Sequence, residues 1–369
     1  MNLSAPAAAL RARAQGLERG VIAGALTLLL VGFVLALAAS PVAAARLQLE
    51  GSFTLAWRHA VSAAAASAVL VGLSLLSERQ VRRAAFGLGI VALVLLLAVF
   101  VFGPEINGAR RWLSLFGVSL QPSELAKPAV IALSAWMLSE KLRTPGFPGY
   151  ALALGLAAPF VALQVVQPDL GQTALLLATL AVMMFLAGAP LRFAPLGLGA
   201  AAVFLALAYV FVPYVRRRVT LFLDPERNPE QVERSLETIR AGGLIGVGPG
   251  EGDAKASLPD AHADFIYAVG AEEFGLLLSL GLPALYAWIA WRGLKAAAAA
   301  ESGFARIAAG GLMTLFALQA AIHIAVNLNL APTKGMTLPF VSFGGSAMLG
   351  SAVTIGMALA LTRKAQPHG

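Results

Sequence analysis

The chain has 369 residues, of which 59% are hydrophobic and only 12% are charged. This composition lies outside the range of soluble globular domains and is typical of integral membrane proteins. There is no cysteine, which excludes disulfides and Cys-based metal sites, and the four histidines show no metal-ligand spacing. The net charge of +8 does not require nucleic acid as a partner, because positive charge beside membrane spans sets orientation and contacts anionic lipid.

The apolar runs predict an all-α integral membrane protein, a polytopic bundle of about ten transmembrane helices. The spans are expected near residues 21–42, 59–77, 84–103, 122–140, 149–167, 170–189, 194–213, 262–290, 303–325 and 338–362. Only Pro168-Asp169 separates the fifth and sixth runs, so a nine-span interpretation stays open. The first run is too long for a typical signal-peptide core and more spans follow it, which favours a retained anchor.

Lysines and arginines are concentrated in the loops that lie on the same side as the N-terminus, which predicts that both termini are cytoplasmic. Residues 1–20 and 364–369 are then cytoplasmic tails, and residues 21–363 form a single transmembrane domain. A long extracytoplasmic loop at about 214–261 joins spans seven and eight, and loops of this length usually have a function.

Ionisable side chains gather where the eighth predicted span begins, in the segment LPDAHADFIYAVGAEEFG. They are Asp260, His262, Asp264, Glu272 and Glu273. Charged groups at membrane depth are costly and usually line a wet cavity or take part in chemistry. Asp264 stands at the positive N-terminus of a helix, which favours the ionised form that a general base requires. The alternative is that Asp264 or Asp260 merely caps that helix.

The other groups of this segment have structural alternatives. His262 either orients Asp264 or substrate, or is simply a half-solvated histidine at the interface. Glu272 and Glu273 lie two turns deeper, and a structural or cavity role between helices is favoured over catalysis.

Two further polar clusters are expected at the outer face. In the segment QPDLGQT, Asp169 and Gln172 have the spacing of a capping box. The second cluster comprises Arg110, Arg111, Gln121, Ser123, Glu124 and Lys127. Arginine pairs bind phosphate bidentately and lysine acts as a point charge, so a lipid pyrophosphate is the natural ligand, with ordinary headgroup snorkelling as the alternative. The mixed segment 104–122 is expected to lie at the interface.

The segment NLNLAPTKGMTLPFVSFGG near the C-terminus breaks helical structure at membrane depth through Pro332, Pro339 and Gly344-Gly345. Such backbone is tolerated only where it is buried in protein or lines a cavity. Lys334 at this break is placed to meet an anionic group. Because several polar clusters converge on one face, the sequence favours a membrane enzyme with a polar site there.

Several motifs recur in one order along the chain. They are NGARRW at 107–112, QPSELAKP at 121–128, QPDLGQT at 167–173, GGLIGVGPGEG at 242–252, LPDAHADFIYAVGAEEFG at 258–275 and LAPTKGMTLPFVSFGGS at 330–346. Together they resemble the SEDS family of shape, elongation, division and sporulation proteins. The Gly-Pro-Gly-Glu-Gly turn and the run Thr333 to Met336 are similar to the division-type members rather than the elongation-type ones.

The resemblance implies a ten-span peptidoglycan glycosyltransferase that polymerises lipid II outside the bacterial inner membrane, at the division septum. The family's key aspartate, in a His-Thr-Asp-Phe motif, falls on Asp264, and Ala263 stands where the family has threonine. Asp264 would be the catalytic base. The residues expected to hold substrate or pyrophosphate are Arg110, Arg111, Gln121, Lys127 and Lys334. The expected supporting residues are Glu124, Asp169, Gln172, His262, Glu272, Glu273 and Ser346.

The implied partners are lipid II, a class B penicillin-binding transpeptidase, other division proteins and membrane lipid, but no nucleic acid. No dedicated metal motif is visible, although a divalent cation (Mg or Mn) could share the charge of the pyrophosphate. The alternatives are a lipid II flippase, a polymerase of the elongation type and a non-catalytic scaffold for other division proteins. A flippase should carry polar residues at the midplane and on both faces, whereas here they cluster on the outer face.

Overall fold

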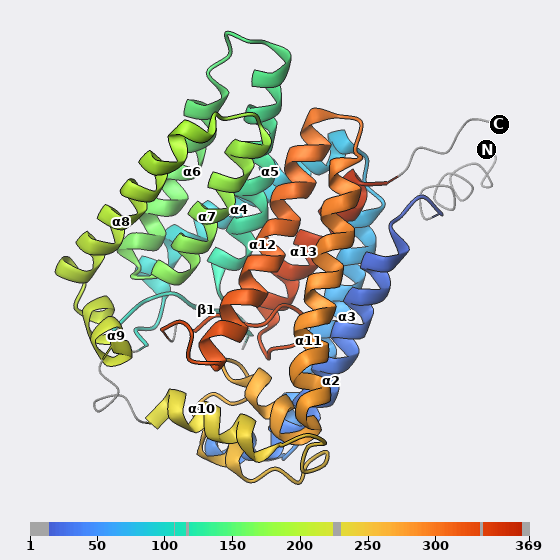
Figure 1. Ribbon diagram of the computed structural model, residues 1–369, viewed down its shortest axis with the longest axis vertical. Helices are drawn as coiled ribbons and strands as arrows, with labels where there is room; N and C mark the ends of the chain where they lie inside the picture. Colours follow the sequence, from blue (N-terminus) through green and yellow to red (C-terminus); the bar gives the residue numbers. More distant parts are fainter. Residues whose placement is uncertain (1–14, 107, 116–117, 224–229, 333–334, 364–369) are drawn as a thin grey trace.

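The computed structural model describes residues 15–106, 108–115, 118–223, 230–332 and 335–363 and shows a bundle of long helices (Figure 1). A helix lies at each of the ten predicted spans. These helices are α2 (Arg19–Arg46), α3 (Thr54–Ser74), α4 (Glu78–Phe102), α5 (Pro122–Arg143), α6 (Gly149–Val166), α7 (Leu170–Leu186), α8 (Ala194–Phe211), α11 (Ile266–Ala298), α12 (Gly303–Asn327) and α13 (Gly345–Leu361). A turn at 167–169 separates α6 from α7, so the two are distinct helices, as the ten-span interpretation expects.

Length and apolar composition make this a multi-pass membrane protein. Among the described residues, seven helices are long and apolar enough to cross a membrane, and α7 and α13 are shorter apolar helices. Helix α5 carries Glu124 and Lys127 and is nevertheless largely buried. Charged side chains at membrane depth therefore lie inside the protein rather than against lipid, as the cost of ionisable groups in hydrocarbon requires.

Helices α5 and α13 form the centre of the bundle and α8 lies at its edge (Figure 1). In α13 every residue from Ser346 to Leu361 except Leu349 is buried. In α8 the only buried residue is Ala208, and side chains such as Leu196 and Leu198 are exposed. The outer surface of α8 is the apolar face that a lipid bilayer would cover.

The two ends of the bundle differ, and we call them the basic end and the loop end. The basic end is where α2 begins and α13 ends. The loop end carries the long 214–261 connection, which contains α9 (Pro213–Leu223), α10 (Glu230–Ala241) and the short helix η2 (Ala254–Ser257). Within the segment expected to be interfacial, strands β1 (Leu113–Leu115) and β2 (Val118–Leu120) form an antiparallel hairpin that its sequence pattern did not predict.

Helix α11 is broken at Gly275, whose φ of 61° and ψ of −147° are not helical. The glycine-rich turn of the long connection lies against this break. The Leu276 N–H donates to the Leu244 carbonyl at 3.1 Å, and the Val247 N–H donates to the Glu272 carbonyl at 2.9 Å. A Cβ on Gly246 would stand 2.2 Å from the Glu273 carbonyl oxygen, so glycine is required for this close approach.

Candidate active site at the loop end

Asp264 lies in the turn immediately before α11, half-buried at the loop end. The N-cap residue of α11 is Phe265, and no side-chain hydrogen bond caps the helix there. A side chain of α12 instead accepts a hydrogen bond from the first turn of α11: the Ala268 N–H donates to Oδ1 of Asn327 at 3.3 Å. The alternative that Asp264 or Asp260 serves as the cap is therefore wrong.

The segment from Gly335 to Gly344 re-enters the bundle beside Asp264. A Cβ on Gly335 would stand 3.6 Å from Oδ2 of Asp264, so this backbone passes directly by the carboxylate. Its carbonyls are used by buried side chains: Met336 O lies 2.6 Å from His323 Nδ1, and Tyr286 donates to Pro339 O at 2.5 Å. The non-helical backbone at membrane depth is thus satisfied within the protein. The predicted cation Lys334 lies outside the described residues.

Lys127 lies inside the bundle with 1% of its side chain exposed. Its Nζ is 3.0 Å from a Glu124 carboxylate oxygen and donates to Oε1 of Gln172 at 2.6 Å and Oε1 of Gln319 at 2.8 Å. An ammonium group has three donors, so these oxygens use all of them. Gln172 also donates to Glu124 at 2.7 Å. A pyrophosphate could reach Lys127 only by displacing one of these partners.

Asp169 is the N-cap residue of α7 but makes no capping hydrogen bond, so the predicted capping box with Gln172 is wrong. Its Oδ2 instead accepts from Gln121 Nε2 at 3.1 Å and Ser123 Oγ at 3.3 Å, both at the start of α5. Burial raises the pKa of Asp169, while the Arg111 guanidinium and the Gln121 hydrogen bond oppose that shift. The predicted supporting residue Ser346 accepts from the Gln121 N–H at 3.1 Å and so ties α13 to this cluster.

The two predicted arginines occupy different environments. Arg111 is half-buried and donates to the carbonyls of Gln167 and Pro168, at 3.4 and 2.6 Å, which fastens the turn between α6 and α7. Arg110 is exposed and lies 3.8 Å from Glu105. Of the two, Arg110 is thus the arginine presented to solvent at the loop end.

Glu272 and Glu273 hold the long connection rather than line the space around Asp264. Glu272 accepts hydrogen bonds from the N–H groups of Ala254 and Lys255 at 2.7 and 3.0 Å. Glu273 accepts from the Gly250 N–H and forms a buried ion pair with the Lys255 ammonium. Both carboxylates thus make structural contacts, one of the two roles, structural or cavity, that the sequence favoured over catalysis.

His262 lies in the same turn as Asp264, and its ring packs against Phe343 with centroids 5.4 Å apart. Burial lowers the pKa of His262, and the nearby Asp260 carboxylate only partly offsets this. The ring is therefore neutral near neutral pH and provides packing at the base of the turn.

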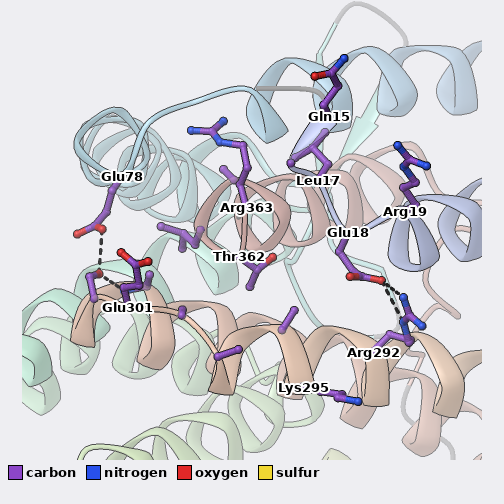
Figure 2. A pocket seen from close by; sticks show the side chains of 18 of the residues that line it. Gln15, Leu17, Glu18, Arg19, Glu78, Arg292, Lys295, Glu301, Thr362 and Arg363 are labelled. Carbon is purple, nitrogen blue, oxygen red and sulfur yellow. Dashed lines mark hydrogen bonds and ion pairs between the residues drawn. The ribbon is translucent and has the colours of Figure 1, made fainter. Parts of the chain in front are cut away.

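Two cavities lie away from Asp264. One, of about 1080 Å³, opens at the basic end (Figure 2), where Glu18 pairs with Arg292 and Glu78 accepts from Ser302. A cavity of about 10 Å³ lies deeper, between Lys127, Gln319 and Thr354 among others. That volume holds about one water molecule.

Sequence reasoning did not single out Asn327, Ser342, Gln319 or Lys255. Each is a buried polar side chain whose partner lies far away in the sequence. A faint signal existed for Asn327 and Gln319, because an amide inside an otherwise apolar helix needs a hydrogen-bonding partner. The sequence does not show which partner that is.

The fold and this site define a class: a polytopic helical membrane protein with a half-buried carboxylate above a buried polar network. The family model described as "Cell cycle protein", which covers FtsW, RodA and SpoVE, matches residues 19–366. The chain belongs to this family, as the resemblance predicted.

Known relatives and solved structures support the same family assignment. The chain is 44% identical over 94% of its length, and 89% of the relative's, to a probable peptidoglycan glycosyltransferase FtsW of Caulobacter vibrioides. It is 36% identical to one of Geobacter sp., over 94% of this chain and 97% of that one.

Among solved structures, it resembles a chain from "Structural coordination of polymerization and crosslinking by a peptidoglycan synthase complex", with a TM-score of 0.76 and 29% identity over 94% and 97% of the two chains. The rod shape determining protein RodA of Thermus thermophilus has a TM-score of 0.67 and 28% identity over 93% and 95%.

Proposed function

We propose that this protein is a peptidoglycan glycosyltransferase that polymerises lipid II into glycan strands during septal cell-wall synthesis. The observation that carries the proposal is the half-buried carboxylate of Asp264 at the loop end, in the turn that the family resemblance assigns to catalysis. Two relatives that align with 94% of this chain are themselves named probable peptidoglycan glycosyltransferases, which supports the same reaction here.

In the proposed reaction the 4-hydroxyl of the acceptor sugar attacks C1 of the donor's N-acetylmuramic acid. The new C1–O bond forms as the bond from C1 to the pyrophosphate oxygen breaks, which releases undecaprenyl pyrophosphate with inversion at C1. Asp264 accepts the hydroxyl proton, a contribution of typically ~10²–10⁴-fold to the rate. No covalent intermediate with the protein is needed.

The leaving pyrophosphate needs positive charge. Arg110 donates to the Phe100 carbonyl at 3.2 Å but is exposed at this end. It therefore suits that role better than the half-buried Arg111 or the buried Lys127. Lys334 remains a predicted ligand for the same group.

A magnesium or manganese ion remains an expectation from the chemistry of pyrophosphate. No group of three His, Asp or Glu side chains within the described ranges would hold such an ion with protein ligands alone. An ion at this site would depend on the substrate's own phosphate oxygens.

Location and partners complete the proposal. The loop end faces outward from the cytoplasmic (inner) membrane at the division septum, and both termini are cytoplasmic, in accord with the positive charge at the basic end. A class B penicillin-binding transpeptidase is the proposed partner, together with other division proteins. The resemblance to a chain of a complex that coordinates polymerisation with crosslinking supports this partner.

The rival function is a lipid II flippase, and the large cavity at the basic end is the observation that favours it. A flippase needs a path between the two ends. Deeper in the bundle, the cavity beside Lys127 has room for about one water, while the centre is filled by buried side chains of α5 and α13. This packing favours the polymerase.

The test is polymerisation of labelled lipid II by the protein in complex with its transpeptidase, with wild type compared to Asp264→Asn. Strands from wild type alone would support the general base. Equal strand synthesis by both would refute that role for Asp264. Absence of strands from two intact complexes, together with transbilayer movement of lipid II, would shift the assignment to the flippase.

A further inference from the structure

The backbone of the turn that carries Asp264 is held by donors from outside that turn. Three consecutive carbonyls each accept one hydrogen bond: His262 O from the Phe343 N–H at 3.0 Å, Ala263 O from Ser342 Oγ at 2.7 Å, and Asp264 O from Asn327 Nδ2 at 3.0 Å. Two of these donors belong to the re-entrant segment and the third is the last residue of α12.

Asn327 is fully buried and uses its whole amide. Besides Asp264 O, Nδ2 donates to His323 O at 2.9 Å, and Oδ1 accepts the Ala268 N–H in the first turn of α11. One side chain therefore joins the end of α12, the turn with Asp264 and the start of α11. Because a buried amide is costly unless it is hydrogen-bonded, this arrangement favours one position of the turn.

Ser342 links the turn to the re-entrant segment. Its hydroxyl accepts from the Leu338 N–H at 2.7 Å and donates to Ala263 O, and the Ser342 N–H donates back to Leu338 O at 2.9 Å. The same segment passes Oδ2 of Asp264 at Gly335. The backbone of the turn is therefore joined to the segment that passes beside the carboxylate.

We propose that Asn327 and Ser342 are positioning residues, which fix the backbone of the Asp264 turn so that the carboxylate meets the acceptor hydroxyl at reacting distance. The inference rests on the proposed function. A displacement of about 1 Å at a reacting group can cost about 10²-fold in rate.

The test compares Asn327→Leu and Ser342→Ala in the complex with the transpeptidase, by kcat and KM for lipid II. We expect kcat to fall about 10- to 100-fold, with KM within about two-fold of wild type, because substrate binding is not altered. Ser342→Thr keeps the hydroxyl and should restore most of the kcat lost in Ser342→Ala.

Control variants change buried polar groups that lie outside the Asp264 turn. Ser139 is a buried serine on α5 whose hydroxyl donates to Trp136 O, and the amide of Gln164 on α6 has no hydrogen-bond partner among the described residues. Ser139→Ala and Gln164→Leu should therefore leave kcat unchanged. An equal fall of kcat in the controls would overturn the proposal, since it would show general destabilisation.

Hydrogen exchange gives a readout that does not depend on activity. Amides 262–268 should exchange faster in Asn327→Leu, because the Ala268 N–H loses its acceptor. Faster exchange with unchanged kcat would overturn the positioning role. Full activity of Asp264→Asn would instead refute the proposed base, while the exchange data would still report whether Asn327 holds the turn.

Discussion

The two ends of the bundle differ in how deeply their polar side chains are buried. At the basic end, charges pair on the partly exposed surface, both within one helix, as in Arg82 with Glu78, and between distant segments, as in Arg292 with Glu18. At the loop end, polar side chains are buried and shared between distant segments, as in Lys127 with Gln319, which are 192 residues apart.

The helix caps differ in part. At the basic end, Ser77 caps α4 and Ser302 caps α12 with their own hydroxyls, whereas α6 and α8 begin there without a side-chain cap. At the loop end α5, α7, α11 and α13 begin without a side-chain cap from their N-cap residue. Their first turns are instead adjacent to a polar network assembled by tertiary contacts. We infer that the basic end orients the protein in the membrane and that the loop end performs chemistry.

The largest expected effect is a loss of polymerisation when the loop-end carboxylate is changed, in contrast to a carboxylate at the basic end. Asp264→Asn should lower lipid II polymerisation by about 10²–10⁴-fold, because the proposed general base is removed. Glu18→Gln at the basic end should leave the rate within about two-fold, since only an ion pair between helix ends is lost. Strand synthesis by purified complexes measures both rates. Equal losses of rate in the two variants would contradict the assignment of chemistry to the loop end.

Lys127→Met should strongly lower stability, because Glu124 would remain buried without its counter-charge. Breaking a buried pair by removing one partner costs about 3–5 kcal/mol. The double variant Lys127→Met with Glu124→Leu should recover part of that loss, since neither charge is then left unpaired. Thermal unfolding in lipid nanodiscs provides the comparison. A single variant as stable as wild type would show that the charge at position 124 is solvated or neutral.

Glu273→Gln should loosen the long connection while α11 stays folded. The change weakens the contacts with Lys255 and with the Gly250 N–H, and leaving buried donors poorly satisfied costs about 1–3 kcal/mol. Limited proteolysis and hydrogen exchange within 242–257 should increase. Unchanged protection would mean that Glu272 alone anchors the connection.

A smaller, pH-dependent effect is expected from His262. Burial lowers its pKa in the folded protein, so the unfolded chain binds the proton more readily. Its contribution to the free energy of unfolding is then present above the unfolded pKa of about 6.5 and is lost as the pH falls. Melting temperatures from about pH 8 down to about pH 5 should fall less steeply for His262→Gln than for wild type. Parallel curves would assign the acid sensitivity to other groups.

The smallest effect is expected from Arg292→Gln, which removes the ion pair with Glu18 at the basic end. Partly exposed pairs contribute about 0–1 kcal/mol because solvent and salt screen them. Thermal stability should change little. A loss as large as that of Lys127→Met would show that the basic end depends on its charges as much as the loop end does.

Hydropathy alone placed the helices. For Glu272 and Glu273 the sequence favoured a structural or cavity role over catalysis, and their contacts with the long connection are of the structural kind. The capping box proposed for Asp169 and Gln172 was wrong for a physical reason. Gln121 and Ser123 on α5 compete for the Asp169 carboxylate, while Lys127 and Glu124 take the side chain of Gln172. A capping motif describes only partners that are close in sequence. Packing of the helices placed other hydrogen-bonding partners beside Asp169 and Gln172.

The amino-acid sequence by itself determined the membrane class, the positions of the ten helices and the end at which polar residues gather. Those properties follow from the free energy of transferring side chains from water to hydrocarbon. That free energy is largely a sum over residues that are neighbours in the sequence. Only the tertiary structure decided which polar groups meet: Lys127 with Gln319, Asn327 with the backbone of Asp264, and Glu273 with Lys255. Each buried polar group must find a partner wherever packing brings one, and sequence spacing does not encode that choice.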